Sequence, residues 1–172
     1  MRLIVSDASS LILLTKVGLT EILFQNFKLV IPERVYEECV NQDTLKKYPD
    51  ALTIQQWVLD KKIRVEKVDV SNVHYMYKIN QGEKEAIALS LRDPESTLLT
   101  DDGNAVKIAK YLNKRFIISP LVVVDLYQMG KISYEKGKSS IEQLSVIGRY
   151  LPNLIADVLM MLGARRKEKE RK

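Results

Sequence analysis

Acidic side chains follow two short apolar segments that the sequence predicts to be strands. Asp7 comes directly after residues 2–6. Asp101 and Asp102 come directly after residues 96–100. The carboxyl ends of parallel strands meet at one edge of a sheet, and functional groups gather in the crevice beyond that edge. We therefore expect these three carboxylates to lie close together.

Two further pairs of acids lie on predicted helices. Glu37 and Glu38 lie in the helix after a predicted strand, and both flank its apolar stripe about equally, so spacing does not choose between them. Glu83 and Glu85 open another helix, and Glu85 has apolar side chains three and four positions further on. These acids could join the same crevice.

Clustered carboxylates are the ligand set that Mg²⁺ and Mn²⁺ prefer. Without a cation, the repulsion within such a cluster raises pKa values and costs stability. Metal ions in such a site can activate water and stabilise the leaving oxygen of a phosphodiester. Zinc-finger and cysteine-nucleophile chemistry both lack parts, since Cys39 and His74 are the only residues of their kinds.

Each acid also has a purely structural interpretation. Asp7, Asp101 or Asp102 could be the N-cap of the helix that follows it. Glu83 and Glu85 lie in a first helical turn, where negative charge suits the helix dipole. The placement of acids after two separate strands favours a shared site over independent caps.

Positive charge gathers at the end of the chain. The net charge is +5, and residues 165–172 (RRKEKERK) carry +4 of it, so the rest of the chain carries +1. This tail is either a solvated helix end or an arm that contacts RNA phosphates. A single cysteine fits a reducing, cytoplasmic compartment. No uncharged run reaches the roughly 18 residues of a membrane span, so we expect a soluble protein.

Short apolar strands alternate with helices along nearly the whole chain. The predicted strands are residues 2–6, 28–31, 63–68, 96–100 and 115–118. The predicted helices are 10–27 with a break near Gly18, 32–40, 50–61, 83–92, 103–113, 120–129 and 134–165. This order predicts an α/β fold whose small, mostly parallel sheet is covered on both faces. The length fits one domain, with residues 1–133 as its catalytic part and residues 134–172 as a helical extension.

Five stretches resemble the PIN-domain family, especially VapC-like toxin ribonucleases of archaea and bacteria, and occur in the family's order. They are VSDASSLILLTKVG (5–18), KLVIPERVYEECV (28–40), GEKEAIALSL (82–91), TLLTDDGNAVKIA (97–109) and FIISPLVVVDLYQMGKIS (116–133). The resemblance implies a three-layer α/β/α fold and cleavage of RNA that depends on Mg²⁺ or Mn²⁺. It also implies a homodimer and, for a toxin, a small antitoxin partner.

The resemblance assigns site residues by position. The family's four acids match Asp7, Glu38, Glu85 and Asp102, with Asp101 as an alternative metal ligand. Supporting polar positions match Ser9, Thr100 and Asn104, the last standing where some relatives carry another Asp. The family often has Asp at the third position, where this chain has Glu85. Basic side chains that could hold the substrate backbone are Lys107, Lys110 and Arg115.

The leading hypothesis is a metal-dependent endoribonuclease, in the role of a toxin. One alternative is a PIN-like module that binds RNA or protein without cutting, although all four acid positions are filled. Another is a metal-dependent DNA nuclease or phosphatase. A phosphatase with an Asp nucleophile would need Asp-x-Asp after the first strand, and the chain has Asp7-Ala8-Ser9.

Overall fold

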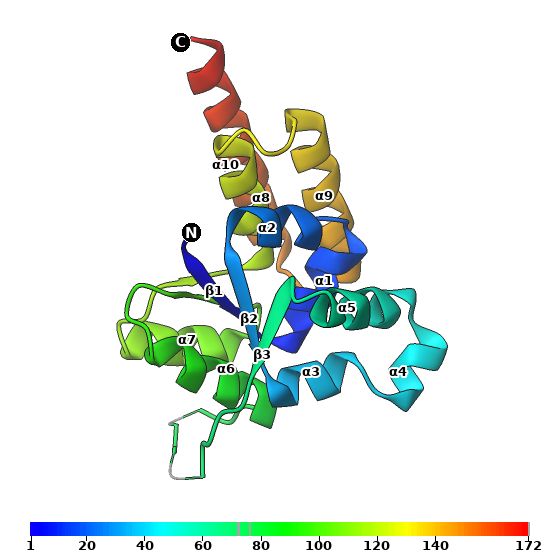
Figure 1. Cartoon of the computed structure of the whole chain (residues 1–172). Helices are drawn as coiled ribbons and strands as arrows, with labels where there is room; N and C mark the ends of the chain where they lie inside the picture. Colours follow the sequence, from blue (N-terminus) through cyan, green and yellow to red (C-terminus); the bar gives the residue numbers. More distant parts are fainter. Residues whose placement is uncertain (72, 76, 172) are drawn as a thin grey trace. The chain divides into compact units, whose positions relative to one another are not determined.

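The computed structural model describes residues 1–71, 73–75 and 77–171. It contains a sheet of five parallel strands in the order β3-β2-β1-β4-β5 (Figure 1). The strands are β1 (Leu3–Ser6), β2 (Lys28–Pro32), β3 (Ile63–Glu66), β4 (Thr97–Leu99) and β5 (Phe116–Ile117). The predicted α/β fold with a small parallel sheet is confirmed.

The chain divides into two compact units, Met1–Ile117 and Ile118–Lys172, here called the N-terminal and C-terminal units. The N-terminal unit holds the sheet and the helices α1 (Ala8–Lys16), α2 (Thr20–Asn26), α3 (Glu33–Cys39), α4 (Gln42–Lys47), α5 (Pro49–Leu59), α6 (Gln81–Leu91) and α7 (Gly103–Tyr111). Helices α6 and α7 lie on one side of the sheet and α1, α2 and α5 on the other (Figure 1). Gly18 adopts φ +72°, a left-handed conformation that glycine tolerates, and separates α1 from α2.

Alternation along the strands builds the core between the sheet and helices α6 and α7. Val5, Val30 and Leu98 are buried and belong to one apolar cluster with residues of both helices. The cluster residues from the helices include Ala86, Ile87, Leu89, Ala105, Ile108 and Ala109. Small alanines let the helices pack closely on the sheet.

The C-terminal unit consists of α8 (Ser119–Gln128), α9 (Tyr134–Ile147) and α10 (Pro152–Glu170). The prediction that residues 134–165 are helical throughout was wrong between α9 and α10, where the chain leaves the helix. Gly148 is the C-cap of α9, and Pro152 begins α10. The boundary predicted at 133/134 stays a prediction, and the last residue of the basic tail lies outside the described residues.

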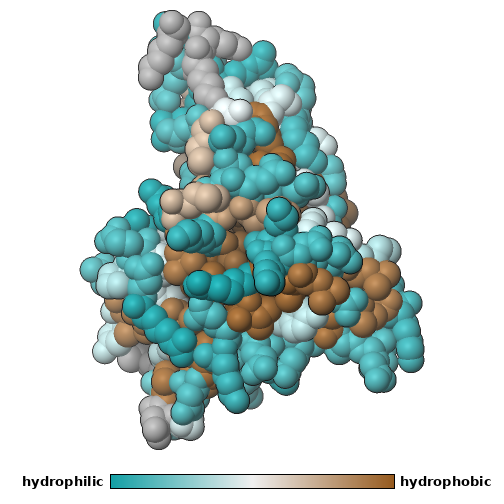
Figure 2. Space-filling model, viewed as in Figure 1, coloured by the Kyte–Doolittle hydropathy of each residue, from teal (hydrophilic) through white to brown (hydrophobic). Residues whose placement is uncertain are grey.

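No single described helix is long and apolar enough to cross a membrane. Only α1 and α2 taken together pass such a test, and they bend by 111° at their junction. Figure 2 shows hydrophilic side chains over most of the viewed face, with hydrophobic side chains reaching the surface between them.

Candidate active site

The candidate site lies where the strand order reverses direction. β1 has β2 on one side and β4 on the other. From β1 the chain adds β2 and β3 toward one edge of the sheet, and later adds β4 and β5 toward the opposite edge. Asp7 follows β1 directly, and Asp101 follows β4 after Thr100. Ligand sites of open parallel sheets form at the carboxyl ends of strands at such a switch point.

Asp7 is buried and accepts several hydrogen bonds. Its Oδ1 accepts from the backbone N–H of Ser10 at 2.8 Å and from Ser9 Oγ at 3.2 Å. Its Oδ2 accepts from Thr100 Oγ1 at 2.5 Å. Asp7 is therefore the N-cap of α1, as the alternative, purely structural interpretation of this residue predicted. Its second carboxylate oxygen, Oδ2, instead contacts Thr100, the residue after β4. Oδ1 accepts two of these bonds and Oδ2 accepts one, so the second lone pair of Oδ2 leaves room for a further ligand.

Burial changes the acidity of Asp7. Only 2% of the residue is exposed. Burial raises the pKa of Asp7 to about 6, against the lowering effects of hydrogen bonds from Thr100 and Ser10, and the charge of Asp101 raises it further. No ion pair of the described residues involves Asp7. Within the described residues, the Asp7 carboxylate thus accepts hydrogen bonds but has no cation paired with it.

Ser10 and Thr100 connect Asp7 to the two acids after β4. Ser10 Oγ donates to Asp101 Oδ2 at 2.7 Å. The backbone N–H of Asp102 donates to Thr100 Oγ1 at 3.3 Å. Asp102 is also the N-cap of α7, since its Oδ1 accepts from the backbone N–H groups of the second and third residues of that helix at 2.8 and 2.7 Å. The structure thus brings Asp7, Asp101 and Asp102 into one hydrogen-bonded network.

Glu38 reaches toward α6 through a contact with a glycine. A Cβ built on Gly82 would lie 2.7 Å from both carboxylate oxygens of Glu38, so only a glycine leaves them this space. Burial raises the pKa of Glu38, while Arg34 and the backbone N–H of Gly82 lower it and Glu85 raises it. Arg34 pairs with both acids, at 3.2 Å from Glu37 and 3.4 Å from Glu38. Glu37 is the more exposed of the two, and the contact with Gly82 belongs to Glu38, so the structure distinguishes two acids that spacing left equivalent.

Glu85 and Glu83 extend the acidic region along α6. Glu85 is 8% exposed and its Oε1 accepts from Gln81 Nε2 at 2.9 Å. Glu83 forms a capping box with Asn80. Burial raises the pKa of Glu83, and the charges of Asp102, Asp7 and Glu38 raise it further. Glu83 therefore belongs electrostatically to the same acidic region, although the family resemblance did not assign it a site position.

The predicted supporting and basic residues are spread more widely. Asn104 Nδ2 donates to the backbone oxygen of Lys78 at 3.1 Å. Lys107 Nζ lies 5.3 Å from the ring centroid of Tyr77, on the exposed side of α7. Lys110 Nζ lies 5.9 Å from the ring centroid of Phe116, further along the same helix. Arg115, which precedes β5, lies at the amino end of the sheet, away from the carboxylates.

The donor chemistry fits a hard divalent cation. The network of Asp7, Ser10, Thr100, Asp101 and Asp102 offers carboxylate and hydroxyl oxygens, and burial raises the pKa of Asp7, Glu38 and Glu83. In the part of the chain that the structure describes, no three His, Cys, Asp or Glu side chains stand close enough together to hold a metal ion as they are. A cation would offset the repulsion between the acids of this region.

Thiol chemistry is disfavoured at this edge. Cys39 is buried next to Glu38, and burial, with the charges of Glu38 and Asp7, raises the pKa of its thiol to about 12. The thiol therefore stays protonated near neutral pH and is a poor nucleophile.

Comparison with known proteins gives one match. A family model described as a PIN domain matches residues 3–163. Neither a curated protein nor a solved structure matches the chain.

Proposed function

Because this chain belongs to the PIN-domain family, we propose that it is an endoribonuclease that uses Mg²⁺ or Mn²⁺ to hydrolyse RNA phosphodiesters. PIN domains are generally nucleases and typically use divalent metal ions. The observation that carries the proposal is the network that joins Asp7, through Ser10 and Thr100, to the acids after β4. The toxin role, the antitoxin partner, the homodimer and the cytoplasmic location stay predictions.

The residues that would hold the metal are the acids of the network and of the neighbouring helices. They are Asp7, Glu38, Glu85 and Asp102, with Asp101 as the alternative ligand after β4. A bound divalent ion supplies Lewis-acid chemistry, because it lowers the pKa of water and offsets charge on the phosphoryl group.

The surrounding polar groups orient these acids. Thr100 Oγ1 and the backbone N–H of Ser10 fix the two oxygens of Asp7, and Gln81 fixes one oxygen of Glu85. Gly82 leaves room for the carboxylate of Glu38 against α6. Such outer partners hold ligand side chains in one orientation, and losing one typically costs about 10–100-fold in affinity or activity.

Helix α7 offers a place for the RNA beside the acids. Asp102 caps its amino end, and with about 1.5 Å of rise per residue, Lys107 and Lys110 lie roughly 8 and 12 Å further along its axis. The exposed pair of Lys107 and Tyr77 suits one nucleotide, with the ring stacking on a base and the ammonium group near a phosphate. These contacts would position the strand with a phosphodiester next to the carboxylates.

The test is cleavage of labelled single-stranded and hairpin RNA by the full chain, with Mg²⁺, with Mn²⁺ and with EDTA. Asp7→Asn is the informative variant because an amide keeps the cap of α1, and the Thr100 hydroxyl can rotate to accept a hydrogen bond. We expect metal-dependent cleavage that falls by at least about 10³-fold in Asp7→Asn.

Other outcomes would change the assignment. Cleavage that persists in EDTA or in Asp7→Asn would overturn the proposal. RNA binding without cleavage would favour a binding module, and cleavage of the matching DNA but not of the RNA would favour a DNA nuclease.

A further inference from the structure

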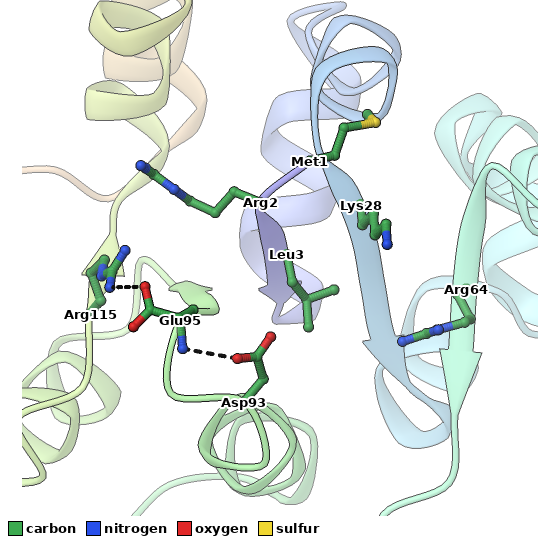
Figure 3. Close-up of a pocket in the computed structure, with 8 residues that line it drawn as sticks. All are labelled: Met1, Arg2, Leu3, Lys28, Arg64, Asp93, Glu95 and Arg115. Carbon is green, nitrogen blue, oxygen red and sulfur yellow. Dashed lines mark hydrogen bonds and ion pairs between the residues drawn. The ribbon is translucent and has the colours of Figure 1, made fainter.

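A groove lined by basic side chains lies at the amino end of the sheet, opposite the carboxylates. Its cavity volume is about 510 Å³. Four cations from separate segments line it together with two acids of the turn between α6 and β4 (Figure 3). The cations are Arg2, Lys28, Arg64 and Arg115, and the acids are Asp93 and Glu95.

Strand register explains how distant residues meet in this groove. Lys28 and Val30 are two positions apart on β2 and therefore point to the same face of the sheet. Arg64 of β3 pairs with Val30, so it shares that face with Lys28. Figure 3 shows the side chain of Arg64 extending from β3 toward β2. The parallel arrangement thus gathers the amino ends of β1, β2 and β3 into one basic surface.

The groove carries more positive than negative charge, since four basic and two acidic residues line it. Arg115 pairs with Glu95 at 3.0 Å, and Arg64 pairs with Glu66 at 2.5 Å. Among the ion pairs of the described residues, none involves Arg2 or Lys28, and both residues are exposed. Two long cationic side chains are therefore available to an anionic ligand.

A second hollow continues the basic surface. It has a volume of about 270 Å³ and shares Lys28 and Arg64 with the first groove. Lys61 and Lys62, in the turn before β3, add two more cations to its lining. The cations therefore extend as a strip from β5 across to the turn before β3, which suits a long polyanion better than a compact anion.

We propose that this amino-end groove binds the phosphodiester backbone of a single RNA strand. Arginine guanidinium groups match phosphate oxygens, and a strip of cations grips a backbone without reading its sequence. An acidic peptide fits less well, because peptides commonly pair along an exposed edge strand, and this groove crosses strand ends.

The inference rests on the proposed function and extends it by assigning where the uncut part of the substrate binds. Helix α7 runs from Asp102 at the carboxylates back toward Arg115 at the groove, a length of about 14 Å for its 9 residues. Lys107 and Lys110 lie exposed between these two points. One RNA strand can therefore contact the carboxylates, α7 and the groove in turn.

The experiment measures binding of a short fluorescein-labelled single-stranded RNA in EDTA over a series of salt concentrations. The test variant is Arg2→Gln with Lys28→Gln. The matched control is Lys46→Gln with Lys47→Gln, because these exposed lysines on α4 line neither hollow. Two lost phosphate contacts should reduce the slope of log affinity against log salt by about 1.4, and the control should not change the slope.

A variant of opposite sign sharpens the test. Glu95→Gln removes an acid from the groove and releases Arg115, so RNA should bind more tightly and the slope should steepen by about 0.7. Equal slopes for the test and control variants, or no RNA binding by the parent chain, would overturn the inference. Poly-glutamate binding that falls in the test variant, with RNA binding unchanged, would overturn it in favour of an acidic protein partner.

Cleavage of the same RNA with Mg²⁺ separates the two proposals. RNA binding that weakens in Arg2→Gln with Lys28→Gln, without cleavage under any condition, would support the proposed RNA groove and overturn the proposed nuclease activity. If Arg2→Gln with Lys28→Gln cleaves RNA in a metal-dependent way with the KM and the salt slope of the parent, the nuclease proposal is supported and the groove proposal is overturned.

Discussion

The two ends of the sheet differ in the sign of their charge and in how that charge is held. At the carboxyl end, Asp7 and Glu85 are buried and oriented by hydrogen bonds. At the amino end, Arg2 and Lys28 are exposed on long side chains without acidic partners among the described ion pairs. Chemistry at a phosphodiester needs fixed groups, whereas grip on a backbone needs only charge within reach. The predictions below ask whether the two ends can be perturbed separately.

The largest expected effect is a dependence of stability on pH that comes from the carboxyl end. Burial raises the pKa of Asp7 from 3.8 to about 6, so the folded state binds this proton more tightly than the unfolded chain. The contribution to stability is therefore complete below about pH 4 and is lost as the pH rises through about 6. Without metal, the loss should reach about 3 kcal/mol in urea unfolding.

Asp7→Asn is the control, since an amide does not titrate in this range. The free energy of unfolding of the variant should fall much less than that of the parent between about pH 4 and 7. Mg²⁺ or Mn²⁺ should stabilise the parent more above pH 6 than below it, because metals bind the deprotonated carboxylate. A parent and variant with the same pH profile would contradict this account of Asp7.

The second prediction concerns Gly82, where activity and stability should move in opposite directions. A Cβ at this position would lie 2.7 Å from the oxygens of Glu38 and would displace that carboxylate. Gly82→Ala should therefore reduce cleavage by about 10–100-fold. Alanine favours the helix over glycine, so the free energy of unfolding should stay the same or rise by up to about 1 kcal/mol.

Gly103→Ala is a matched control in the first turn of α7, because a Cβ there would meet nothing within 4 Å. It should leave cleavage near the parent level. Equal activities for the two alanine variants would show that the position of Glu38 does not matter to cleavage.

The ends of the strands could be predicted well from the sequence. Because three of the acids follow strands, the position of much of the carboxylate region could be predicted with them. Asp7, Asp101 and Asp102 follow short apolar segments, and the switch point of the sheet places them together. The choice between Glu37 and Glu38 could not be made, because it depends on the contact between α3 and Gly82 of α6. Helix α4 was missed because its six residues bury no side chain and so show no apolar pattern.

The amino-end groove could not be predicted from spacing at all. Arg2, Lys28, Arg64 and Arg115 are isolated in the sequence, and each looks like an ordinary surface cation. The pairing of β2 with β1 and β3, and of β4 with β1 and β5, brings their strands together. The structure places Arg115 in this groove and not among the carboxylates, and its role in holding substrate stays a prediction. Ser10 was missed because its role is a contact with Asp101, 91 residues away.

The smallest effect is expected at Ser10, and it distinguishes Asp101 from Asp102. Ser10→Ala removes the 2.7 Å hydrogen bond to Asp101 but keeps the backbone N–H that caps Asp7. The variant should lose about 1 kcal/mol of stability. If Asp101 takes part in cleavage, the rate should fall about tenfold, and the effects of Ser10→Ala and Asp101→Asn should not add. Additive effects would show that Ser10 does not act through Asp101. No loss of rate in Asp101→Asn would make Asp102 the working acid after β4, and RNA binding in EDTA should be unchanged throughout.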